Sequence, residues 1–358
     1  MKIHFLYFLI SAIFSFNLSA QINRPQEPKE PFNYIIEDVE FKNNMDSISL
    51  AGTLTYPKEG SNFPAVILIS GSGPQDRNSD MMNHKPFMVI ADYFTNKGIA
   101  VLRVDDRGTG ASEGNYNATG LDGFVSDTNS AFEFIKTHSA INPVKIGLIG
   151  HSLGGVIAPI IASKNQDVSF IVLLAGSGIR GDKLMLLQKE IIERKMGVPE
   201  AGITQGQNYM KGAYNIILNS NNDDNQLQSD LKDYFNEIFG AMLTDSQIKS
   251  LSEQMSMPWL TDFIKFDPKE SLSKTKCPIL ALNGANDLQV PSKENLEAIE
   301  AILLANGNTN TKTMTLDDLN HLFQESKTGL PNEYAIIEQT FSPMALDIMF
   351  EWIKRQTE

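Results

Sequence analysis

The hydrophobic pattern at the start of the folded region alternates along the chain. Two runs, 34–41 and 47–55, alternate apolar with polar residues on either side of a short segment, 42–46. A period of two is typical of strands that bury one face, and two such runs joined by a short connection indicate an antiparallel hairpin. We therefore expect folded structure to begin near Tyr34 with this hairpin.

From residue 65 onward the apolar runs are hydrophobic on both faces, and helical patterns separate them. The expected strands are 65–70, 99–104, 144–149, 170–174, 278–283 and 311–316. The expected helices are 87–96, 121–137, 156–163, 292–304 and 343–355. Apolar strands separated by helices are typical of a mostly parallel sheet with helices on both faces. The expected fold class is therefore three-layer α/β.

The alternation of strands and helices stops between residues 182 and 265. Segments rich in Leu, Ile, Lys, Glu and Gln favour helices there, and Gly206, Gly212 and the polar run 219–225 interrupt them. We interpret 182–265 as a helical cap inserted into one domain that spans residues 34–358.

The first 20 residues have the composition of a secretory signal peptide. Lys2 precedes an apolar run, 5–16, and the segment ends on the small residue Ala20. The run is shorter than the roughly 20 residues that span a bilayer, which argues against the alternative of a membrane anchor. We expect export, secreted or periplasmic, with no stable membrane span after cleavage of residues 1–20. Residues 21–33 contain three prolines and are expected to form an extended linker.

The size and charge of the chain limit the classes of molecule that we expect it to bind. With 358 residues, 42% of them hydrophobic, it can bury a large core, and its formal net charge is −13. No later stretch concentrates Lys and Arg, so nucleic acid and anionic membranes are disfavoured as partners. A small molecule is the expected partner, and the oligomeric state stays open.

The motif that carries chemistry is Gly150-His151-Ser152-Leu153-Gly154, a G-x-S-x-G pattern between an expected strand and an expected helix. In this setting the pattern indicates a serine on a sharp turn, with its hydroxyl above the edge of the sheet. The alternative is a glycine-rich structural turn. We interpret Ser152 as a catalytic nucleophile.

A serine hydroxyl needs a histidine that accepts its proton. The chain has five histidines, and His321 follows the last expected strand, where an α/β sheet can deliver a base. His151, beside Ser152, is expected to point away from it. We therefore predict His321 as the general base, against the alternative of a structural loop histidine.

The histidine in turn needs a carboxylate that orients it and stabilises its cation. Asp287 lies three residues beyond Gly284, where an apolar strand ends, and it falls between the serine and the histidine in chain order. Asp317 and Asp318 are nearer to His321 in sequence, but we expect them to cap or solvate the turn. Asp287 is the predicted acid.

The oxyanion of the reaction needs two backbone donors. One is expected to be the N–H of Leu153, which follows the nucleophile. The other is expected from the glycine-rich loop after the first parallel strand, where we choose Ser72, with Gly71 and Gly73 as alternatives. The loop 105–110 borders the same sheet edge and is expected to shape the pocket rather than to react.

Taken together, the serine turn, the strand end at Asp287, His321 and the inserted cap resemble the α/β-hydrolase family. Three segments narrow the resemblance, namely SGSGPQDR at 70–77, DDRGTG at 105–110 and LNHLFQ at 319–324. They resemble bacterial secreted carboxylesterases of the serine-aminopeptidase-like and dienelactone-hydrolase-like branch. This resemblance implies hydrolysis of carboxylic esters by a Ser152, Asp287 and His321 triad, with no metal and no cofactor.

One departure from the family concerns the oxyanion loop. Lipases and many esterases carry a His-Gly dipeptide before this loop, whereas this chain has Ser70-Gly71. The departure weakens both the choice of the second oxyanion donor and any transfer of substrate preference.

Other functions are compatible with parts of the sequence. The segment 176–181 matches G-x-G-x-x-G, which would suit a nicotinamide-dependent enzyme, but no second strand with an acidic end follows within about 30 residues. A serine peptidase of the aminopeptidase type would use the same triad. A non-catalytic binding protein is a third alternative, because fold alone does not establish function.

Overall fold

The computed structural model describes residues 23–221 and 224–358. The predicted signal peptide, residues 1–20, and the first residues of the predicted linker lie outside the described residues. None of the helices in the described ranges combines the length and the apolar character of a membrane span.

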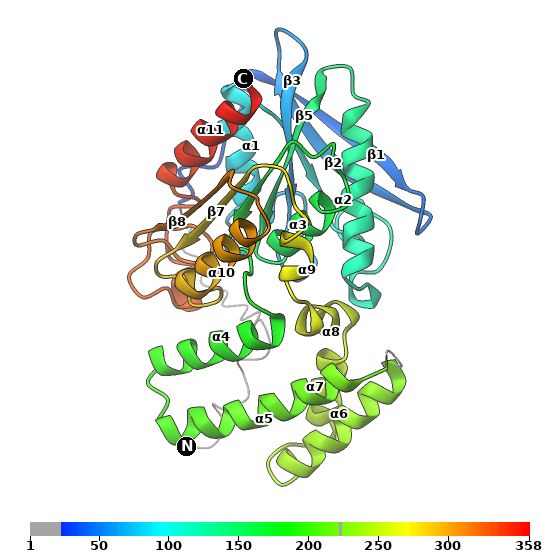
Figure 1. Ribbon diagram of the computed structural model, residues 1–358, viewed down its shortest axis with the longest axis vertical. Helices are drawn as coiled ribbons and strands as arrows, with labels where there is room; N and C mark the ends of the chain where they lie inside the picture. Colours follow the sequence, from blue (N-terminus) through cyan, green and yellow to red (C-terminus); the bar gives the residue numbers. More distant parts are fainter. Residues whose placement is uncertain (1–22, 222–223) are drawn as a thin grey trace.

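In the described residues, eight strands form the central sheet. They are β1 (Tyr34–Asn43), β2 (Ile48–Pro57), β3 (Phe63–Ile69), β4 (Ala100–Val104), β5 (Ile141–His151), β6 (Phe170–Leu174), β7 (Ile279–Gly284) and β8 (Thr311–Leu316). Their order across the sheet is β1-β2-β4-β3-β5-β6-β7-β8 (Figure 1). β2 pairs antiparallel with β1 and β4, and all other neighbours are parallel. The predicted mostly parallel sheet with an N-terminal antiparallel hairpin is confirmed.

Helices cover both faces of this sheet. They are α1 (Pro86–Asn96), α2 (Leu121–Lys136), α3 (Gly154–Ala162), α9 (Lys269–Leu272), α10 (Ser292–Ala305) and α11 (Pro343–Thr357), with short 3-10 helices η1 (Tyr116–Ala118) and η2 (Pro331–Glu333). α1 and α11 pack together on one face, and α2, α3, α9 and α10 form the layer on the other (Figure 1). This arrangement is the predicted three-layer architecture.

The core lies between the sheet and its two helix layers. Every residue of β6 is buried, and central side chains such as Ile67, Leu148 and Leu280 are at most 1% exposed. Neither face of such strands contacts solvent, which explains why their sequences are apolar throughout. β5 begins at Ile141 rather than at Val144, because Phe63 pairs with Ile141 before a shift in register.

Apart from residues 222 and 223, which the structure does not describe, the interval predicted to be a helical cap contains five helices. They are α4 (Gly181–Lys195), α5 (Glu200–Asn219), α6 (Asp224–Phe239), α7 (Asp245–Met255) and α8 (Pro258–Lys265). They lie beyond one end of the sheet and share a hydrophobic cluster of their own (Figure 1). Met185 and Trp259 pack against both this cluster and the main core. The Asp262 carboxylate of α8 also accepts a hydrogen bond from the N–H of Leu121 at 2.9 Å, which ties the helices to the start of α2.

The described part of the predicted linker is docked on the domain. The Arg24 guanidinium donates to four backbone carbonyls, those of Met82, Asn83, Ala335 and Ile337. The Gln26 side chain also exchanges hydrogen bonds with the backbone of Thr340 and Phe341. The segment therefore fastens two loops to each other, which its proline-rich composition did not indicate.

Candidate active site

Ser152 lies at the turn between β5 and α3. Its φ angle of 54° is in the left-handed region, which is costly for a residue that carries a side chain. The Ser152 N–H donates to the carbonyl oxygen of Leu174 at 2.9 Å, so the end of β6 holds the turn in place. The turn therefore has the strained backbone that the G-x-S-x-G pattern predicts.

The two glycines that flank Ser152 are needed for close packing. A Cβ at Gly150 would lie 2.0 Å from the carbonyl oxygen of Gly154, and a Cβ at Gly154 would lie 2.3 Å from that of Ile69. No side chain fits at such distances. The glycines let α3 start directly against the ends of β5 and β3, and this close approach sets the position of Ser152.

Asp287 and His321 are joined by a hydrogen bond. The His321 Nδ1–H donates to Oδ2 of Asp287 at 2.9 Å, and the two residues are 5% and 3% exposed. The other carboxylate oxygen of Asp287 accepts from the N–H groups of Gln289 and Val290. With the proton on Nδ1, the Nε2 atom of His321 carries a lone pair, which is the state that a general base requires.

The loop that carries His321 is held by its own side chains and by a close backbone contact. Oδ1 of Asn320 accepts from the N–H groups of Leu322 and Gln324 at 2.9 and 3.0 Å. A Cβ at Gly284 would lie 2.0 Å from the carbonyl oxygen of Leu319, so the loop passes directly over the end of β7. The ends of β7 and β8 thereby bring Asp287 and His321 to one edge of the sheet.

The alternative acids lie elsewhere. Asp317 and Asp318 are exposed in the turn after β8, and Asp318 has a φ of 62°. In the described residues, the carboxylate that contacts His321 belongs to Asp287.

His151 contributes a contact that the sequence did not indicate. We expected its ring to point away from Ser152. Its Nε2–H donates to the backbone carbonyl of His321 at 2.8 Å, and the two rings lie 4.9 Å apart between centroids. Burial lowers the pKa of His151 to about 4, so the ring is neutral at pH 7. The G-x-S-x-G pattern accepts any residue at this position, which is why the pattern assigned His151 no role.

His151 thus connects the loop that carries His321 to the turn that carries Ser152. Within residues 23–221 and 224–358, the Ser152 hydroxyl forms no hydrogen bond with the His321 ring. Hydrogen bonds between catalytic groups are often long before substrate binds and tighten in the complex.

The loop after β3 passes beside Ser152. A Cβ at Gly71 would lie 3.4 Å from the Cβ of Ser152. The Gly73 N–H donates to the Tyr116 hydroxyl at 2.8 Å, so it is engaged and is a poor candidate for an oxyanion donor. In the described part of the chain, the N–H groups of Ser72 and Leu153 have no such acceptor. The role of Ser72 and Leu153 as oxyanion donors stays a prediction.

The glycines at 176–181 serve packing at the exit from the sheet. A Cβ at Gly178 would lie 2.1 Å from the carbonyl oxygen of Asn295, and one at Gly181 would lie 1.7 Å from that of Phe263. In the described residues β6 is followed by six helices before β7, so this segment lacks the short strand–helix–strand unit of a dinucleotide site.

Comparison with known families agrees with this arrangement. The model of a family described as serine aminopeptidase, S33, matches residues 84–323. The match covers more than half of the chain and includes Ser152, Asp287 and His321. The chain belongs to this family of α/β-hydrolases.

Two curated relatives match parts of the chain. Esterase EstD of Thermotoga maritima is 25% identical over 288 residues, which cover 80% of this chain and 61% of the esterase. Polyketide transferase ATR5 of Stachybotrys chlorohalonatus is 32% identical over 142 residues, which cover 39% of this chain and 44% of the transferase. The matched part of this chain therefore spans less than two thirds of the length of either relative.

Solved structures show the same fold. An esterase from Pyrococcus furiosus has a TM-score of 0.55 and 17% identity, covering 94% of this chain and 98% of the esterase. The α/β hydrolase GrgF from Penicillium sp. sh18 has a TM-score of 0.54 and 18% identity, covering 90% of this chain and 99% of GrgF.

Proposed function

We propose that this protein is a serine esterase that cleaves carboxylic esters through Ser152, His321 and Asp287. The observation that carries the proposal is the hydrogen bond between His321 and Asp287, at the same sheet edge as a serine in a strained strand-to-helix turn. Acyl transfer by such a triad needs neither a metal nor a cofactor.

The reaction proceeds in two halves. In the first, Nε2 of His321 accepts the proton of the Ser152 hydroxyl while Oγ attacks the ester carbonyl carbon. The N–H groups of Leu153 and Ser72 hold the oxyanion, and Asp287 stabilises the imidazolium. The tetrahedral intermediate collapses, His321 gives its proton to the leaving alcohol, and an acyl-enzyme remains. In the second half, His321 activates a water molecule that releases the acid and regenerates Ser152.

A peptidase is the second candidate, because the matching family is described as serine aminopeptidases. Amide and ester hydrolysis use the same triad, so the substrate decides between them. The ester is favoured by the relative named as an esterase. The apolar N-terminal segment supports the further proposal that the enzyme is exported, secreted or periplasmic.

The test is hydrolysis of p-nitrophenyl esters of increasing acyl length beside aminoacyl and dipeptidyl p-nitroanilides. The wild type is compared with Ser152→Ala and with Ser130→Ala, a control on α2 whose hydroxyl bonds only within its helix in the described structure. Ester turnover that is lost in Ser152→Ala and kept in Ser130→Ala would support the esterase. Faster anilide turnover would make the protein a peptidase. Equal activity of the wild type and Ser152→Ala would overturn the triad.

A further inference from the structure

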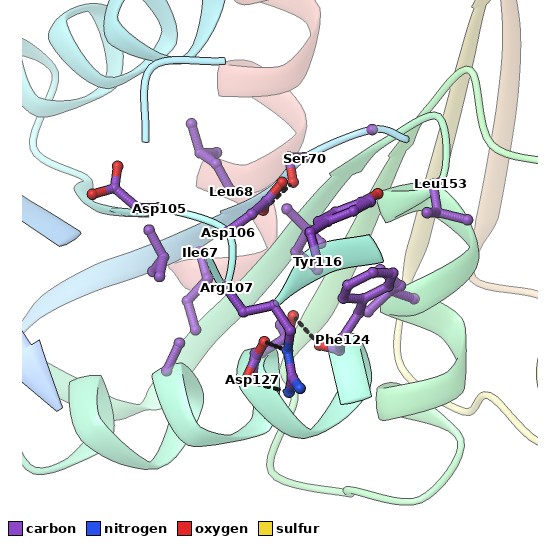
Figure 2. A pocket seen from close by; sticks show the side chains of 16 residues that line it. Ile67, Leu68, Ser70, Asp105, Asp106, Arg107, Tyr116, Phe124, Asp127 and Leu153 are labelled. Carbon is purple, nitrogen blue, oxygen red and sulfur yellow. Dashed lines mark hydrogen bonds and ion pairs between the residues drawn. The ribbon is translucent and has the colours of Figure 1, made fainter. Parts of the chain in front are cut away.

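Asp106 forms hydrogen bonds with both ends of the loop 70–75, which passes beside Ser152. Its Oδ1 accepts from the Ser70 hydroxyl at 2.6 Å, and its Oδ2 accepts from the Gln75 N–H at 2.9 Å. Its own backbone N–H donates to the carbonyl oxygen of Gln75 at 3.0 Å. Figure 2 shows the Asp106 carboxyl group facing Ser70 across this contact. One residue at the end of β4 therefore holds the first and the last residue of the segment 70–75.

A cavity of about 50 Å³ lies next to this loop (Figure 2). Ser70, Gly71 and Leu153 line it, together with Asp106 and Tyr116. Side chains that fill the space beside a loop restrict its shape by packing, and here that support is incomplete. The loop is therefore restrained by its hydrogen bonds, those to Asp106 at its two ends and that from the Gly73 N–H to the Tyr116 hydroxyl.

The charged groups around Asp106 are already paired with other residues. Asp105 binds Arg77, while the Arg107 guanidinium binds Asp127 of α2 and Asp46. Among the residues that the structure describes, Asp106 forms no ion pair. Burial raises the pKa of Asp106 to about 7, and the nearby carboxylates of Asp127 and Asp105 add to this shift. Burying a carboxyl group without an ion pair costs free energy. In this position the carboxyl group of Asp106 supplies two hydrogen-bond acceptors to the loop.

We propose that Asp106 is a positioning residue that aims the Ser72 N–H at the oxyanion by holding Ser70 and Gln75. This inference rests on the proposed hydrolase function, because it assigns the loop to the oxyanion site. Since the oxyanion forms only in the transition state, a misdirected donor lowers kcat and leaves KM almost unchanged.

Two substitutions separate the hydrogen bonds of Asp106 from its charge. In Asp106→Asn the amide oxygen can accept from the Gln75 N–H, and the amide nitrogen can donate to the Ser70 hydroxyl, which is able to accept. In Asp106→Leu both bonds are lost at similar volume. We expect kcat to fall about 100-fold in Asp106→Leu, as when one oxyanion donor is removed, and to stay within about threefold in Asp106→Asn. KM should change less than about threefold in both.

The matched control is Thr128→Val, which changes a residue that lines the same cavity. In the described structure the Thr128 hydroxyl donates only to the carbonyl oxygen of Phe124 in its own helix. Its kcat and KM should equal those of the wild type. Unchanged kcat in Asp106→Leu, an equal loss in Asp106→Asn and Asp106→Leu, or a loss confined to KM would each overturn the positioning role.

Hydrogen–deuterium exchange of the loop amides tests the same role without any substrate. We expect faster exchange at the Gln75 amide in Asp106→Leu and wild-type exchange in Asp106→Asn. An inactive wild type would overturn the esterase proposal, whereas unchanged exchange in Asp106→Leu would overturn the role of Asp106. If Asp106→Leu does not fold, Ser70→Ala removes one of the two side-chain bonds. It should lower kcat about tenfold with KM kept, and an unchanged kcat would overturn the proposal.

Discussion

The imidazole of His151 donates a hydrogen bond to the backbone carbonyl of His321 at 2.8 Å, across 170 positions of sequence. His151 directly precedes the proposed nucleophile, and His321 is the proposed base. A single side chain therefore links the turn that carries Ser152 to the loop that carries its proton acceptor. We infer that this link helps to set the relative position of the proposed nucleophile and the proposed base.

Replacing His151 by Phe tests the link between the two loops. Phe keeps an aromatic ring but has no N–H to offer to the His321 carbonyl. We expect kcat to fall at least about tenfold with KM nearly unchanged, because small displacements of reacting groups are costly in rate. Steady-state kinetics and a thermal unfolding curve measure both effects. A wild-type kcat in His151→Phe would show that the link is dispensable.

Replacing Asp287 by Asn tests the role of the acid. The Asn oxygen can still accept from the Gln289 and Val290 N–H groups, but its amide nitrogen would meet His321 Nδ1 and favour the wrong tautomer. By analogy with other triads, kcat should fall about 10³- to 10⁴-fold while the fold is kept. Asp317→Asn, at the exposed alternative, should keep full activity. Full activity in Asp287→Asn together with a loss in Asp317→Asn would mean that the acid is Asp317, in the turn after β8.

Asp106 links stability to pH. Burial raises the pKa of Asp106 to about 7, whereas an aspartate in an unfolded chain titrates near pH 4. Between these values the folded state binds more protons, so the contribution of Asp106 to the free energy of unfolding falls as the pH rises from about 4 to about 7 and is constant above. Asp106→Asn lacks this dependence.

Urea unfolding of the wild type and Asp106→Asn at about pH 5 and about pH 8 measures this linkage. Relative to the wild type, the free energy of unfolding of Asp106→Asn should rise by roughly 2 to 3 kcal/mol between the two pH values. A difference that is the same at both pH values would mean that Asp106 titrates alike in the folded and the unfolded chain.

The glycine before the nucleophile turn is predicted to tolerate no side chain. In Gly150→Ala the new Cβ would meet the Gly154 carbonyl oxygen at 2.0 Å, so the strand end and the helix must move apart. We expect a loss of roughly 2 kcal/mol or more in the free energy of unfolding. Gly197→Ala, where a Cβ meets nothing within 4 Å but φ is +79°, should lose only about 1 kcal/mol. Equal losses would mean that the crowding at Gly150 is relieved at little cost.

Much of the fold was predictable because its signals are local. The apolar strands and the hairpin at Tyr34 follow from the period of the hydrophobic pattern, and the parallel order brings the residues after β7 and β8 to one edge. The pairing of Asp287 with His321 in the structure follows the same logic of strand ends.

The parts that the sequence did not reveal are contacts between distant segments. The Arg24 guanidinium binds carbonyl groups more than 300 positions away, and no local pattern encodes such a contact. The same holds for His151, whose partner is a backbone atom of another loop. It also holds for Asp106, whose two carboxylate oxygens accept hydrogen bonds from residues that follow a different strand. Because every residue has a backbone carbonyl, a hydrogen bond to one requires no particular residue type, and no sequence pattern indicates it.

The proposed activation of Ser152 as a nucleophile is tested most directly by reaction of the enzyme with a fluorophosphonate, followed by mass spectrometry of the digested protein. We predict one adduct per chain, located on Ser152, absent from Ser152→Ala and formed much more slowly in Asp287→Asn. Labelling at another residue, or no labelling of a folded wild type, would contradict it.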